Sequence, residues 1–97
     1  MPREKLLREW ECGGRRWRLV DEGGVTGLHR VYLLRDDGRG WCYADHEGDA
    51  CEKRPILEEN VHDRAGRVEL AERAEKIGRR ASREWARRAK VREVVTP

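Results

Sequence analysis

The last third of the chain has the pattern of one long helix, and this feature does most to limit the folds open to the sequence. Asp63, a residue type that often caps helix N-termini, precedes the pattern. Apolar residues then recur at intervals of three and four, as on one face of an α-helix, at Leu70, Ala74, Ile77, Ala81 and Trp85. The pattern predicts a helix over residues 63–93 whose apolar face packs on a sheet formed by the rest of the chain.

Positive charge is concentrated at the C-terminal end of this predicted helix. The apolar face continues beyond Trp85 into Arg88 and Arg92, so the last two turns are not expected to pack on a dry core and should project beyond the domain. Between Arg79 and Arg92 there are seven basic residues and one acid, Glu84, although the whole protein has a net charge of only +3. Separated charge of one sign attracts an anionic partner, such as nucleic acid or an acidic protein surface.

Residues 6–21 have the pattern of a β-hairpin. Two alternating runs flank Gly13-Gly14, a pair that can supply the positive φ angles of a two-residue turn. This turn would fix the register as Cys12 with Arg15, Glu11 with Arg16, Trp10 with Trp17, Glu9 with Arg18 and Leu7 with Val20. Opposite charges then pair on one face while the tryptophans pair on the other, so one face should be solvated and the other buried.

Residues 28–45 have the pattern of a second hairpin, with Asp37-Gly38 as its two-residue turn. This turn would pair Tyr32 with Tyr43 and Leu34 with Trp41 on one face, and Val31 with Ala44 and Leu33 with Cys42 on the other. Both faces are apolar, and one helix can cover only one of them. The face with Tyr32, Leu34, Trp41 and Tyr43 is therefore a candidate surface for stacking bases, for a protein partner or for a homodimer.

Residues 46–62 contain Gly48, Pro55 and mixed charge, so we expect a loop with a short strand near Cys51 and a helical turn over 55–60. The whole chain of 97 residues is then predicted to be one α+β domain. Its architecture would be a small antiparallel sheet of two hairpins packed against one long C-terminal helix.

Several classes of protein are disfavoured by the sequence. No apolar stretch is long enough for a membrane span, and the N-terminus lacks the apolar run of a secretory signal, so we expect a cytoplasmic protein that does not bind membranes. Three cysteines at irregular spacing argue against a disulfide framework. Cys42, His46 and Cys51 are residue types that bind zinc, but their spacing on a strand is too wide, so we expect neither a metal nor another cofactor.

The sequence favours a non-enzymatic binding module that docks its basic helix on nucleic acid or a nucleoprotein complex. The residues predicted to contact phosphates are Arg79, Arg80, Arg83, Arg87, Arg88, Lys90 and Arg92. One alternative is a small protein-binding adaptor or stoichiometric inhibitor, of the kind that mobile genetic elements direct against host machinery, with the apolar hairpin face as its interface. A weaker alternative is a small ribonuclease that uses His29 and His46, which would lie opposite each other in the predicted register.

Overall fold

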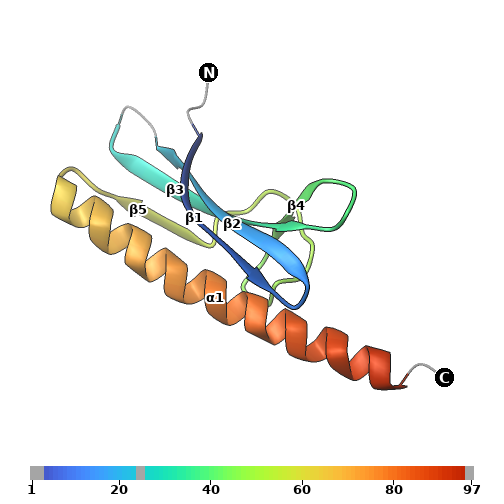
Figure 1. Ribbon diagram of the computed structural model, residues 1–97. Helices are drawn as coiled ribbons and strands as arrows, with labels where there is room; N and C mark the ends of the chain where they lie inside the picture. The colour runs from blue at the N-terminus through green and yellow to red at the C-terminus, as the bar shows by residue number, and fades with distance from the viewer. Residues whose placement is uncertain (1–3, 24–25, 96–97) are drawn as a thin grey trace.

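A five-stranded antiparallel sheet lies against one long helix in the computed structural model, which describes residues 4–23 and 26–95, and the side chains of the helix as far as Val91 (Figure 1). The elements are β1 (Glu4–Cys12), β2 (Arg15–Gly23), β3 (Leu28–Asp36), β4 (Trp41–Ala44), β5 (Leu57–Asn60) and α1 (Arg64–Val95). The strands are ordered β1-β2-β3-β4, and β5 also pairs with β3. The predicted α+β class is confirmed. At 1.5 Å per residue the 32-residue helix is about 48 Å long, which accounts for the 52 Å length of the molecule.

The first hairpin has the predicted turn and most of the predicted register. Gly13 and Gly14 have φ angles of 64° and 75°, and the pairs from Cys12–Arg15 to Glu9–Arg18 form as expected. The predicted pair of Leu7 with Val20 is wrong, because Val20 pairs with Leu6 and the register shifts at a bulge between Leu6 and Arg8. The bulge turns Leu7 toward the core, where it packs, whereas Leu6 is 52% exposed.

The second hairpin is shifted by two residues from the predicted register. Leu34 pairs with Tyr43 and Leu33 pairs with Ala44, so the connection has four residues, 37–40, rather than two. Asp36 and Asp37 favour the longer loop, because their side chains each accept a hydrogen bond of 2.9 Å from the backbone two residues on. Since side chains alternate with a period of two, this shift leaves the composition of both faces unchanged.

The helical turn predicted over residues 55–60 is wrong, since Leu57–Asn60 forms β5 instead. Strand β4 pairs with only four residues of β3, from Leu33 to Asp36, and leaves the other half of that edge open. Strand β5 fills it, and Leu28 pairs with Asn60 and Val31 with Leu57. The short strand predicted near Cys51 corresponds to a single bridge between Ala44 and Ala50.

The core lies between the sheet and the apolar face of α1. Its buried members include Trp10, Trp17, Leu19, Val31, Leu33, Leu70, Ala74 and Ala81. Trp17 is fully buried and meets Trp85 edge to face, with ring centroids 5.7 Å apart. Asp63 caps the helix as predicted, because its Oδ1 accepts a hydrogen bond of 2.7 Å from the Gly66 N–H. The described helix has no stretch that is long and apolar enough to cross a membrane.

Candidate functional site

Two of the predicted phosphate-binding arginines contact side chains of the domain itself, although the Arg79 side chain is still 44% exposed. Arg79 lies over the Trp10 ring, with its guanidinium carbon 5.0 Å from the ring centroid, and its Nε donates a 2.8 Å hydrogen bond to Glu75. The indole N–H of Trp10 donates in turn to the buried Ser82 hydroxyl at 3.0 Å. Arg79 therefore belongs to the seam between β1 and α1.

Arg88 is the second of these arginines, and it joins the helix to the loop after β4. Its Nη1 lies 3.0 and 2.9 Å from the two carboxylate oxygens of Asp49, and its Nη2 donates to the Glu47 carbonyl. The hydrogen bond to Asp49 raises the pKa of Arg88 above its ordinary value. The loop reaches the helix because Gly48, with φ of 80°, is buried against the Ala81 carbonyl and Trp85. Arg88 thus makes a contact within the domain, and the helix runs past the tip of the β1–β2 hairpin only in its last turns (Figure 1).

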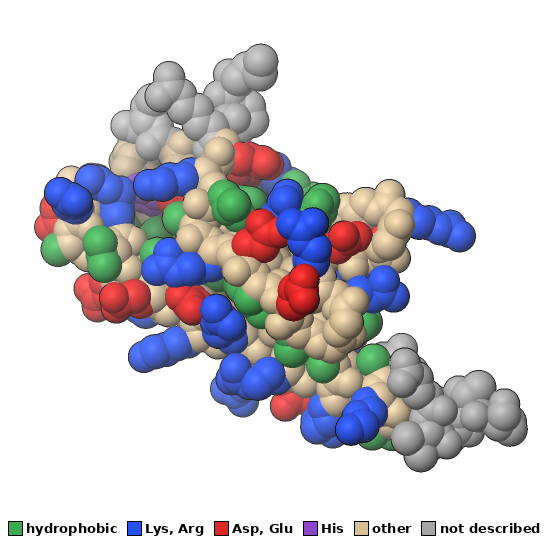
Figure 2. Space-filling view, viewed as in Figure 1, with side chains coloured by type: hydrophobic (Ala, Val, Ile, Leu, Met, Phe, Trp, Pro, Cys, Tyr) green, Lys and Arg blue, Asp and Glu red, His purple; other side chains and the backbone are tan. Residues whose placement is uncertain are grey.

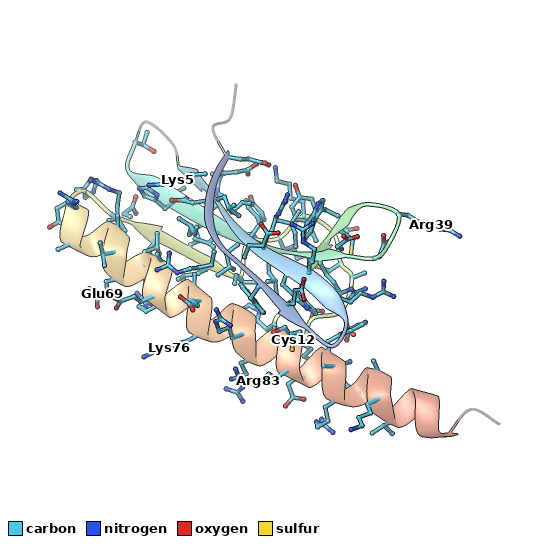
Figure 3. The ribbon with its side chains drawn as sticks, in the orientation of Figure 1. Lys5, Cys12, Arg39, Glu69, Lys76 and Arg83 are labelled. Carbon is cyan, nitrogen blue, oxygen red and sulfur yellow. The ribbon has the colours of Figure 1, made fainter. Side chains whose placement is uncertain are left out.

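The remaining basic residues form a straight row on the outward face of α1, which we call the outer stripe. Its five members alternate at intervals of four and three residues, and all are exposed: Lys76, Arg80, Arg83, Arg87 and Lys90. Figure 3 shows Lys76 and Arg83 pointing away from the sheet, and Figure 2 shows Lys and Arg side chains along the lower edge of the molecule. Arg92 was also predicted to bind phosphate, but its side chain lies outside the described residues.

Few members of the outer stripe form an ion pair, although Glu72 and Glu84 lie beside it on the same helix. Among the described side chains, Arg87 is its one member with an ion pair, at 2.9 Å from Glu84. Hydrogen bonding to Arg87 lowers the pKa of Glu84, so this carboxyl is charged at neutral pH. Lys76 is not among the residues predicted from the sequence, because it precedes the basic run from Arg79 to Arg92. Lys76 lies four residues before Arg80, so the same helical spacing of four and three places it on the same face.

The apolar face of the second hairpin is assembled as predicted, but side chains of the same chain cover much of it. Tyr32 is only 5% exposed. Lys53 lies over Tyr32 and Tyr43, with its Nζ 5.1 and 5.8 Å from the ring centroids, and its Nζ is held 2.8 Å from Glu22. The other two candidate residues, Leu34 and Trp41, are half-buried. Arg16 and Arg18 stack over Trp41 at 5.8 and 4.2 Å. Cations of β2 and of the segment before β5 therefore cover part of this face, while Leu34, Trp41 and Tyr43 remain partly exposed, so its role as a partner surface stays a prediction.

The two histidines of the ribonuclease alternative do not come together. The Nδ1 of His29 lies 2.7 Å from Asp21, between the ends of β2 and β3. His46 lies beyond the end of β4, where its Nε2 is 3.0 Å from the Ile56 carbonyl. The predicted pairing of His29 with His46 fails because the register moved by two residues and β4 ends at Ala44.

The thiols are separate groups as well. Cys12, Cys42 and Cys51 are all unpaired, and burial raises the pKa of Cys51. Within the part of the chain that the structure describes, no group of three or more His, Cys, Asp or Glu side chains is arranged to hold a metal ion.

Comparison with known proteins places this chain in no family. No family model matches it, and no curated protein or solved structure matches it either.

Proposed function

We propose that this protein is a non-enzymatic binding module that docks the outer stripe of α1 on a polyanion, with nucleic acid or a nucleoprotein complex as its partner. The observation that carries this proposal is the alignment of five exposed cations, from Lys76 to Lys90, on one face of a rigid helix. At 1.5 Å per residue the stripe spans about 21 Å, with one cation for roughly each turn. A linear row of this kind suits a linear array of phosphates.

The chemistry of the stripe favours contacts to phosphate over contacts to bases. Three of its five members are arginines, whose planar guanidinium groups bind phosphate oxygens in pairs. Its described members lie on a convex helix surface, and the clustered aromatic side chains, Trp10, Trp17, Trp85 and Tyr32, face the core or the sheet. Binding is therefore expected to be largely independent of sequence.

Stabilisation of the helix dipole is the simplest alternative explanation for cations near a helix C-terminus. Each such cation contributes about 0.3–1 kcal/mol, but the effect falls off within the last turn. The outer stripe begins at Lys76, nineteen residues before the helix ends at Val95. The dipole therefore explains Lys90 better than it explains Lys76, Arg80 or Arg83.

The proposal is tested by the salt dependence of binding to mixed-sequence RNA and duplex DNA, measured by fluorescence anisotropy. Four stripe members have no ion pair among the described side chains, so about four phosphates are neutralised and the slope of log K against log salt should be about −3.6 on duplex DNA. Affinity would then fall on the order of 100-fold between about 50 and 200 mM salt. Replacing Arg80 and Arg83 with Gln should reduce the slope to about −1.8.

A matched control removes the same charge elsewhere. Arg39 and Arg54 are exposed on loops away from α1, and the double variant Arg39→Gln/Arg54→Gln should retain the original slope. Equal loss in both double variants would mean that only net charge matters and would reject the outer stripe. Absence of binding at low salt and tens of micromolar protein would reject the polyanion partner altogether.

A further inference from the structure

A pocket with a volume of 570 Å³ lies between the first half of β1, the end of β2 and the first two turns of α1. This volume falls within the range of small-molecule sites, about 300–1,000 Å³. Figure 1 shows the reason for the opening, since β1 rises away from the helix at this end of the molecule. The pocket's polar floor contains Asp21, Gly23 and His29, and Val68 and Ala71 contribute to an apolar wall on the helix side.

The floor holds a buried carboxylate that is only half satisfied. The side chains of Asp21 and His29 are 10% and 14% exposed, and Oδ2 of Asp21 lies 2.7 Å from Nδ1 of His29. Oδ1 of Asp21 is also buried, and it finds no hydrogen-bond partner among the described residues. It lies 3.9 Å from the position of a Cβ built on Gly23, which lines the same pocket. Such an oxygen requires a donor, and a hydroxyl group of a ligand would supply one once the side chains around the oxygen move aside, because less than 1 Å² of this atom is accessible.

The rim of the pocket is positively charged. Lys5, Arg64 and Arg67 line it, all three are exposed, and none has an ion pair in the described part of the chain. Lys5 lies directly opposite Asp21 in the register of β1 and β2. Arg8 also lines the pocket, but its Nε is held 2.7 Å from Glu75. Three unpaired cations and one carboxylate therefore line the pocket, and this excess of positive charge favours an anionic ligand.

We infer that this pocket binds a small organic phosphate that carries a hydroxyl group and has about the size of a mononucleotide. Lys5, Arg64 and Arg67 hold the phosphate, and the hydroxyl donates to Oδ1 of Asp21. Asp21 also fixes the orientation of the His29 ring, whose Nε2 has no partner in the described part of the chain. The site is independent of the outer stripe, because it lies at the opposite end of α1.

Adenosine 5′-monophosphate is the first probe, with adenosine and inorganic phosphate as its two separated halves. Isothermal titration calorimetry should show saturable binding of the nucleotide at a single site, and NMR should show a shift of the His29 ring signals at the same concentrations. Adenosine and inorganic phosphate should each bind at least about tenfold more weakly, because each satisfies only one end of the site. Equal affinity for either half would overturn the inference, and so would an unmoved His29 ring at saturation.

Two variants test the assigned contacts without altering the core. Replacing the exposed Arg64 and Arg67 with Gln should weaken nucleotide binding about tenfold or more. The pair Arg80→Gln/Arg83→Gln, which removes the same charge from the same helix, should leave it unchanged. Similar weakening by both pairs would show diffuse electrostatic attraction and overturn the site. The variant Gly23→Ala tests the position of His29, because the new Cβ would lie 3.1 Å from Cε1 and Nδ1 of its ring. The His29 ring signals should therefore shift even without ligand. Unshifted signals would contradict the placement of His29 beside Asp21.

Discussion

Gly48 is the residue whose replacement should do most damage for the smallest chemical change. It is buried, its φ angle is +80°, and a Cβ built on it would lie 2.7 Å from both the Ala81 carbonyl oxygen and the Trp85 Cβ. The left-handed backbone costs about 1–2 kcal/mol for an alanine. Forcing apart a helix and a loop that pack this closely costs about 1–3 kcal/mol more. We therefore expect Gly48→Ala to lower the free energy of unfolding by about 2–5 kcal/mol, a large part of the stability of a domain of this size.

The measurement is urea unfolding followed by tryptophan fluorescence, because Trp17 and Trp85 border Gly48. Gly14→Ala is a matched control, since Gly14 has a similar φ of +75° but nothing lies within 4 Å of its Cβ position. The control should lose only the backbone contribution, about 1–2 kcal/mol. Equal losses in the two variants would refute the argument that the loop after β4 packs tightly on the sheet-facing side of α1.

Three further predictions concern α1. Ser82→Ala leaves the buried indole N–H of Trp10 without its acceptor, so unfolding free energy should fall by about 1–3 kcal/mol; an unchanged urea midpoint would count against the bond. Hydrogen bonding to Arg79 holds the pKa of Glu75 below its ordinary value of 4.5, so this carboxylate stabilises the fold above pH 4.5 and loses that effect as the pH falls lower. Glu75→Gln should therefore reduce stability at neutral pH and flatten its decline in acid, as urea midpoints across that range will show. Arg88→Gln should loosen the end of the helix, seen as faster amide exchange, yet leave the salt slope of polyanion binding unchanged.

The first hairpin was predictable because its information is local. The two glycines define the turn, and alternating charges and tryptophans then fix the pairs from Cys12 to Trp10. The bulge at Leu7 was not predicted, because it depends on which leucine of β1 packs against the core beneath the helix. Two adjacent leucines in an alternating strand were the available signal, since strict alternation would expose one of them.

Strand β5 could not be found in the same way. Its sequence, Leu-Glu-Glu-Asn, is short and mostly polar, and neither propensity nor alternation favours a strand there. The segment becomes a strand because β4 leaves the first half of the β3 edge unpaired, and this edge lies more than twenty residues earlier in the chain. The same limit applies to the pocket, where Asp21 and His29 meet only because β2 and β3 pair in one particular register.

Charge counting along the sequence located the basic end of the helix but could not tell which arginines are available to a partner. Arg88 is separated from Asp49 by 39 residues, so no local pattern reveals their ion pair. Helical spacing, by contrast, narrows the choice among the remaining cations, because residues at intervals of three and four share a face. Applied from Lys76 to Lys90, it gives the outer stripe and leaves out Arg88, but it does not separate Arg79, which lies three residues after Lys76 and four before Arg83.

The arginines that contact the domain, Arg79 and Arg88, and the outer stripe have complementary roles in the proposed function. A row of cations attracts a polyanion best when its charges are held in line, and a helix that frays would lose that alignment. The apolar face of α1 is packed as far as Trp85, and Arg88 then continues the attachment by one further turn through Asp49. The helix that carries Arg80, Arg83 and Arg87 is therefore already ordered before the polyanion binds, and binding does not have to supply the free energy for ordering it. The basic residues of α1 thus fall into two groups: some fix the helix to the rest of the domain, and the others are presented by the fixed helix to the proposed polyanion.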